Sequence, residues 1–172
     1  VLTLLSSTGT TNLRFTGTQA IGGNGVIVLS TTGVGSSRII LASSGTATVT
    51  IEPGVTVRGR GFIQQSSLAT LINHGTIEAN APGGTLSISP NAFTNNGLVR
   101  ATDGGTLNIG SQLGPPTTLT SGGVWQLSNG GRLSSSASVT TLAIDLFISG
   151  TGGQLTGGLA GVNRLNGRIG LA

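Results

Sequence analysis

A four-residue motif recurs along this chain: two glycines, one variable residue and a leucine. It reads GGTL at 83–86 and at 104–107, GGRL at 130–133, and GGQL at 152–155. The second glycines of successive copies are 21, 26 and 22 residues apart. Self-similarity at a period of roughly 20–50 residues is typical of chains that stack one short structural unit repeatedly. The motif therefore predicts a repeat architecture.

A second recurring stretch precedes the first three copies of this motif. It reads LINHGTI at 71–77, FTNNGLV at 93–99 and LTSGGVW at 119–125. One slot in it is filled by Asn73, Asn95 and Ser121. Asn tolerates left-handed turns and bonds nearby backbone, and we expect stacked amides here to bond along the repeat axis. Further upstream, VTVRGRGF at 55–62 fits the first part of this stretch, and GTATVTI at 45–51 resembles GTLSI and GTLNI.

The repeating unit consists of strands. Short alternating runs such as GTLSIS and TTLAIDLFIS are bounded by Gly, Asn, Pro and Asp, which is the pattern of strands and turns. A unit of about 22 residues holds about three such strands, which is one coil of a triangular parallel β-helix. The whole chain, 1–172, is predicted to be one β-solenoid domain of roughly seven or eight coils.

The motif itself predicts a corner followed by an inward residue. Its leucines should stack on one another inside the coils: Leu86, Leu107, Leu133 and Leu155. The paired glycines make the corner, where φ is positive or a Cβ would crowd the next coil. The variable residue should point outward, and it is the one that changes: Thr85, Thr106, Arg132 and Gln154.

Composition excludes several other classes. Disordered chains combine low hydrophobicity with high net charge. Here charged residues are only 7% of the chain and Leu, Ile and Val alternate in runs, so both features argue against disorder. Cys is absent, and no apolar stretch is long enough for a transmembrane helix. The net charge of +4 comes from scattered arginines, of which Arg58 and Arg60 are closest, so we expect solubilising or packing roles and no specific nucleic-acid surface, with weak contact to polyanions as the alternative. SQLGPPTTLTS at 111–121 should form a loop around Pro115-Pro116, and LNGRIGLA at 165–172 should start another coil.

The chain begins without Met or a basic leader, so we expect a processed or excised part of a longer repetitive protein.

The run GTIEANAPGGTLSISPNAFTNNGLVRATDGGTLNI at 75–109 resembles repeats of long bacterial surface proteins. These are right-handed β-helix proteins, namely autotransporter passengers and filamentous-haemagglutinin-type adhesins, and the resemblance extends over residues 15–172. It implies right-handed coils, secretion, a cell-surface or matrix location and a structural or adhesive role. It carries no functional residue over to this chain.

Catalytic, cofactor and metal sites are not expected. Glu78 and Asp103 are the one pair of carboxylates worth weighing for glycoside hydrolysis, and Asp103 lies in a turn sequence. The only histidine, His74, follows Asn73 at a turn and has no second ligand nearby in the sequence. IGGNGV at 21–26 lacks a following helix and is a turn, not a phosphate loop. Trp125 should fill the core, with exposure for sugar stacking as the alternative.

We therefore expect a non-enzymatic, extracellular structural or adhesive rod that associates end to end, with host or matrix glycans as possible partners. The alternative is a carbohydrate-binding or carbohydrate-processing β-helix, which a patch of exposed aromatics or two carboxylates facing one groove would favour. Ice binding is a third hypothesis, suggested by the TxT stretches GTATVT and FTGTQ. It needs Thr in register on successive coils, and Arg132 and Gln154 interrupt the column that Thr85 and Thr106 begin.

Overall fold

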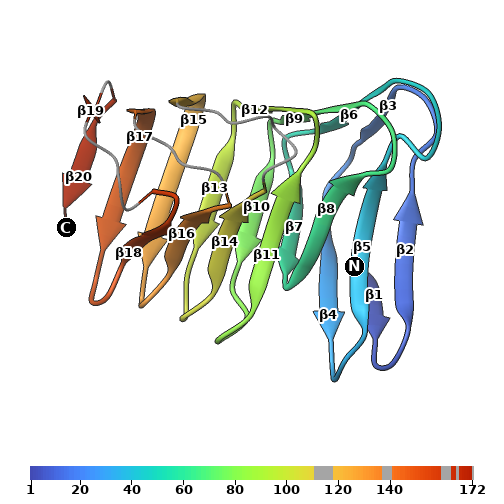
Figure 1. Cartoon of the computed structure of the whole chain (residues 1–172), viewed down its shortest axis with the longest axis horizontal. Coiled ribbons are helices and arrows are strands. Elements are labelled where there is room, and N and C mark those ends of the chain that lie inside the picture. The colour runs from blue at the N-terminus through green and yellow to red at the C-terminus, as the bar shows by residue number, and fades with distance from the viewer. Residues whose placement is uncertain (111–117, 137–140, 160–163, 166, 172) are drawn as a thin grey trace.

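Twenty strands build the described part of the chain, which in this computed structural model comprises residues 1–110, 118–136, 141–159, 164–165 and 167–171. They form three parallel sheets, and the coils stack along one axis from the blue end to the red end of Figure 1. The fold is a β-solenoid of about six turns, with about 24 residues between equivalent positions. The predicted fold class is confirmed, whereas the right-handedness implied by the resemblance stays a prediction.

The three sheets are named A, B and C. Sheet A contains β1 (Leu2–Ser6), β4 (Gly25–Thr31), β7 (Val55–Gly59), β10 (Thr76–Ala79), β13 (Leu98–Ala101), β15 (Thr118–Ser128), β17 (Thr141–Ser149), β19 (Arg164–Leu165) and β20 (Ile169–Leu171). Sheet B contains β2 (Thr10–Arg14), β5 (Ser36–Leu41), β8 (Gly61–Gln65), β11 (Thr85–Ser89), β14 (Thr106–Ile109), β16 (Arg132–Ser135) and β18 (Gln154–Gly157). Sheet C contains β3 (Gln19–Ile21), β6 (Ala47–Ile51), β9 (Ala69–Asn73) and β12 (Ala92–Asn95).

From β1 to β12 the chain visits sheets A, B and C in turn, so each coil has the three strands that the repeat length predicts. The structure has about six turns where seven or eight coils were expected, because the mean interval of about 24 residues is longer than the predicted 22. Register pairs Leu2 with Ile27 and Ile27 with Val57, which are intervals of 25 and 30 residues. The GG-x-L motifs, with intervals of 21, 26 and 22 residues, do not include the 30-residue coil between Ile27 and Val57.

The leucines of the repeated motif stack as predicted. Leu86 pairs with Leu107, Leu107 with Leu133, and Leu133 with Leu155. The first three are buried and Leu155 is half-buried. Full burial of a leucine side chain contributes about 1.5–3 kcal/mol to the free energy of unfolding. The row is therefore a main element of the core.

The two glycines of the motif have different structural roles. At Gly104 φ is +74°, a left-handed conformation that disfavours L side chains, while a Cβ there would meet little. Gly105 has no such φ, but a Cβ on it would overlap the carbonyl of Ala79 in the preceding coil. The first glycine makes the turn and the second allows adjacent coils to approach, which confirms both predicted reasons for the pair.

Other rows of aliphatic residues complete the core. On sheet B the residues at the second inward position are Ile39, Ile63, Ile88 and Ile109. On sheet A the row is Ile27, Val57, Ile77, Val99, Trp125 and Leu146. Residues of both rows are buried. The stacking of like residues on like explains how a chain with few aromatics builds a continuous interior.

Two proposed equivalences between repeats are wrong. VTVRGRGF was expected to fit the first part of the LINHGTI stretch, but it spans the corner between β7 and β8, and Thr76 pairs with Thr56, so Gly75 aligns with Val55 and not with Gly59. GTATVTI was expected to correspond to GTLSI and GTLNI, but it forms β6 in sheet C and pairs with β3 and β9. The strand of sheet B that pairs with β11 on its N-terminal side is β8, where Gly61 stands opposite Leu86. An alternating Thr and Val pattern suits a strand of any sheet, so the sequence pattern does not distinguish the two positions.

Two further predictions concern the C-terminal half. LNGRIGLA does begin another coil, because β20 pairs with β17 through Leu146 and Ile169. The loop predicted around Pro115-Pro116 lies outside the described residues.

Candidate functional site

The slot shared by Asn73, Asn95 and Ser121 forms a polar row inside the aliphatic core. Asn73 and Asn95 are both buried, and Asn73 Nδ2 donates to Asn95 Oδ1 at 2.7 Å. Asn95 Oδ1 also accepts from Gly97 N at 3.2 Å, and Ser121 Oγ donates to the Asn95 carbonyl at 2.9 Å. The predicted bonding of amides along the axis is confirmed. The row fixes the corner between sheets C and A and is structural.

Glu78 lies on the outer face of sheet A, between Arg58 and Arg100 in register. Its Oε1 is 2.8 Å from Arg100 Nη2, and the two neighbouring coils leave the residue only 5% exposed. A carboxylate held by arginine in this way is an acceptor in a cross-strand ion pair. This arrangement gives Glu78 a structural partner.

Asp103 occupies the turn after β13, as predicted. Its φ is +54°, and its exposed side chain accepts a hydrogen bond from Asn129 Nδ2 at 3.4 Å. Asn129 stands at the equivalent turn of the next coil, with φ of +47°. Glu78 and Asp103 thus have different partners and different levels of burial.

Asp145, on β17, binds Arg168, which immediately precedes β20, the last strand of the described residues. Arg168 donates to its carboxylate through Nε at 3.2 Å and through its backbone N at 3.2 Å. The side-chain hydrogen bond from Arg168 is the main cause that holds the pKa of Asp145 below its ordinary value, while desolvation opposes it. The same bond raises the pKa of Arg168. The pair joins β17 to the turn before β20.

The positions of His74, the IGGNGV stretch and Trp125 agree with the sequence predictions. His74 is exposed at its turn, and IGGNGV contains the turn between β3 and β4. Trp125 is 1% exposed and meets Phe93 edge to face with ring centroids 6.2 Å apart, so the core reading is confirmed. Within the described ranges there is no group of three or more His, Cys, Asp or Glu side chains that could hold a metal ion.

Threonines do not form an unbroken column on sheets B or C in the described residues. On sheet B, Thr85 and Thr106 are followed in register by Arg132 and then Gln154, as predicted. On sheet C, one outward column contains Thr48, Thr70 and Ala92, and the next contains Ala20, Thr50, Ile72 and Thr94. The threonines Thr48 and Thr50 of the TxT stretch GTATVT therefore face outward on sheet C, but alanine and isoleucine interrupt their columns.

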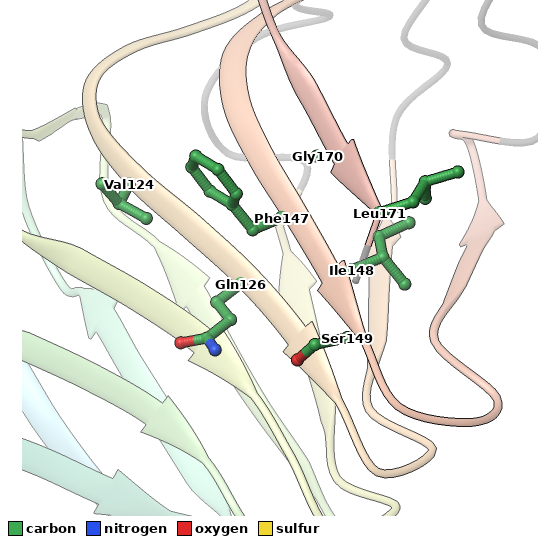
Figure 2. A pocket seen from close by; sticks show the side chains of 7 residues that line it. All are labelled: Val124, Gln126, Phe147, Ile148, Ser149, Gly170 and Leu171. Carbon is green, nitrogen blue, oxygen red and sulfur yellow. The ribbon is translucent and has the colours of Figure 1, made fainter.

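Hollows lie on the surface of the described residues at both ends of the rod and at one corner between sheets. An apolar groove of about 530 Å³ lies at the C-terminal end of sheet A. Figure 2 shows the Phe147 ring between Val124 on one side and Leu171 on the other. A Cβ on Gly170 would lie 2.6 Å from the Phe147 ring, so this ring covers the glycine of the next coil. A groove of about 310 Å³ lies at the opposite end, against β1 and β4.

The third hollow is a polar cleft of about 330 Å³ where sheet A meets sheet B, with Arg60 and Phe62 on its wall. Sequence reasoning noted Arg60 only as a neighbour of Arg58 and did not single out Phe62. Arg58 lies on β7, whereas Arg60 lies at the corner between β7 and β8, where Gly59 and Gly61 both have positive φ. The aromatics with large exposure in the described chain, Phe62 and Phe147, also lie on different sheets and form no shared patch.

Comparison of the chain with protein families, curated proteins and solved structures found no match. The class that the fold itself defines is the β-solenoid repeat protein. No helix among the described residues has the length and apolar character needed to cross a membrane.

Proposed function

We propose that this chain is a non-enzymatic structural and adhesive segment of an extracellular bacterial surface protein. The class would be that of autotransporter passengers and filamentous-haemagglutinin-type adhesins. The observation that supports it best is the continuity of the inward row of sheet A, in which one position repeats from coil to coil from β1 to β20. Such a scaffold holds many copies of a hydroxyl- and amide-bearing surface in fixed register. Weak contacts repeated along it would add up to multivalent attachment.

The proposal includes end-to-end association between copies of the chain. One inward row of sheet A begins at Leu2 and ends at Ile169, which are 45% and 43% exposed. Leu171, at the same end as Ile169, is 79% exposed. Placing β20 of one copy beside β1 of another would continue the parallel ladder and bury these aliphatic side chains. The contact would be the one that already joins successive coils.

Sedimentation velocity over a concentration series tests this association. The wild-type protein should form multimers that grow with concentration, whereas Leu171→Arg should shift it to monomers because a charge would be buried at the junction. Val34→Arg is the matched control, since Val34 is 90% exposed in the loop between β4 and β5. A wild-type protein that stays monomeric throughout, or a control that dissociates as fully as Leu171→Arg, would contradict end-to-end association.

A further inference from the structure

The polar cleft between sheets A and B has a floor of main chain. Gly35, Gly61 and Gly84 line it and contribute no side chain. A Cβ on Gly35 would lie 2.8 Å from the carbonyl oxygen of Gly9, and one on Gly61 would overlap the carbonyl of Ser37. The packing of coils therefore keeps these positions as glycine and leaves the corner hollow. At about 330 Å³ the cleft lies at the small end of the range of roughly 300–1,000 Å³ for small-molecule sites.

An aromatic ring forms one wall of the cleft. Phe62 points outward from β8 and is 36% exposed. The Arg38 guanidinium lies 5.6 Å from the ring centroid, so a cation from the preceding coil holds the ring in place. A partly exposed, fixed ring presents an apolar surface of the kind that the C–H groups of a sugar ring can cover.

Arg60 forms the second wall and brings a positive charge. Its stem packs over Gly84, where a Cβ would lie 3.0 Å from Arg60 Cβ and Cδ. The ion pairs in the described part of the chain are Glu78–Arg100 and Asp145–Arg168, so no carboxylate there neutralises Arg60. Arg60 is half-buried as a residue and has no acidic partner among the described residues, so its guanidinium is suited to take a carboxylate through two parallel hydrogen bonds.

Hydroxyl groups complete the wall around the arginine. Register pairs Arg38 with Phe62 and Leu86 with Gly61, which puts Ser36 and Thr85 on either side of Arg60 in adjacent coils. Both line the cleft. Each hydroxyl can donate or accept a hydrogen bond, as the hydroxyls of a sugar can.

We propose that this cleft binds a uronic acid residue of an acidic polysaccharide. Phe62 would cover the apolar face of the sugar ring, Arg60 would take its carboxylate, and Ser36 and Thr85 would bond its hydroxyls. The cleft lies on the side of the rod, so this binding does not depend on end-to-end association and either can fail without the other.

Titration calorimetry with oligogalacturonate, and with a neutral glucan oligomer of equal length, tests the proposal. Phe62→Ser and Arg60→Thr copy the residues at the equivalent positions of the next coil, Ser87 and Thr85, so both should fold. Arg60→Thr should weaken oligogalacturonate binding about tenfold or more, because the carboxylate loses its charge-assisted hydrogen bonds. Phe62→Ser should also weaken it about tenfold, because the sugar ring loses its apolar contact. Circular dichroism of each variant checks folding before binding is measured.

The chain offers matched controls for both substitutions. Arg132 occupies the same outward column of sheet B as Thr85 and Thr106, and its Nε donates to Gln154 Oε1 at 3.0 Å, while Phe147 is the exposed ring on sheet A. Arg132→Thr and Phe147→Ser should leave the affinity within about twofold. The proposal is overturned if oligogalacturonate does not bind at millimolar concentration, or if Arg132→Thr weakens binding as much as Arg60→Thr. It is also overturned if dextran sulfate binds as tightly as oligogalacturonate and Phe62→Ser has no effect, because charge alone would then explain binding.

Discussion

Replacing Asn95 with alanine should cost the protein about 2–4 kcal/mol of unfolding free energy. Its side chain makes three hydrogen bonds inside the core: from Asn73 Nδ2 at 2.7 Å, from Gly97 N at 3.2 Å, and to the Val124 carbonyl at 3.4 Å. Each buried polar group left without a partner costs about 1–3 kcal/mol. Asn73 Nδ2 retains the Leu98 carbonyl at 3.3 Å, which reduces the loss. The expected loss of unfolding free energy therefore comes mainly from the Gly97 N–H left without an acceptor and from the lost hydrogen bond between the Asn73 and Asn95 side chains.

Urea unfolding followed by Trp125 fluorescence and by circular dichroism measures this cost, and coincident transitions of the two probes would justify a two-state fit. Asn108→Ala is the matched control, because Asn108 bonds Ser136 Oγ at 3.0 Å on the outer face of sheet B, where water can replace the contact. The control should cost less than about 1 kcal/mol. In a double-mutant cycle, Asn73→Ala and Asn95→Ala together should cost about 1 kcal/mol less than the sum of the single changes. Equal costs for Asn95→Ala and Asn108→Ala would refute the reasoning that burial of the polar row matters.

Three further changes probe the core, the corners and the ends. Leu107→Ala should lower the unfolding free energy by about 2–5 kcal/mol in urea titration, because it leaves a cavity in the leucine row; a loss below 1 kcal/mol would argue against tight stacking. Gly104→Ala should cost about 1 kcal/mol through its positive φ, whereas Gly105→Ala should abolish the cooperative transition because its Cβ would overlap a carbonyl of the preceding coil; the reverse order of melting temperatures would contradict these roles. Arg168 holds the pKa of Asp145 in the folded protein below its value in the unfolded chain. The Asp145–Arg168 ion pair therefore stabilises the folded state fully at pH above the unfolded-state pKa of Asp145, and this stabilisation is lost as the pH falls through the folded-state pKa. At acidic pH the protection of the β20 amides against hydrogen exchange should fall in the wild-type protein but change little with pH in Asp145→Asn. The same pH profile in both proteins would show that the ion pair does not stabilise β20.

The core row could be predicted from sequence because two constraints coincide in one motif. The leucine must point inward and the two glycines must make the corner, so the four copies fix both register and face. The slot of Asn73 and Asn95 was predictable for the same reason, since a polar residue before a turn glycine has a local role as well as a stacked one. Trp125 followed from its alignment with Ile77 and Val99.

The placement of GTATVTI and the polar cleft could not be derived in this way. Alternation of small and β-branched residues satisfies strands of sheets B and C equally, so only the observed pairing of β6 with β9 decides between them. The cleft brings together residues from three consecutive coils, and its hollow arises from the packing of glycines rather than from any contiguous motif. Arg60 and Phe62 are two residues apart in sequence, but the ring is positioned by Arg38 from another coil.

Electron microscopy of the purified protein over a concentration series tests the central claim, that the rod is a structural element which joins end to end, most directly. The account predicts unbranched filaments of one uniform width, lengthening with concentration, with an axial repeat of about 4.8 Å between coils in averaged images. Short rods of a single length at every concentration would contradict it, because the edge strands β1 and β20 would then not pair with those of other copies.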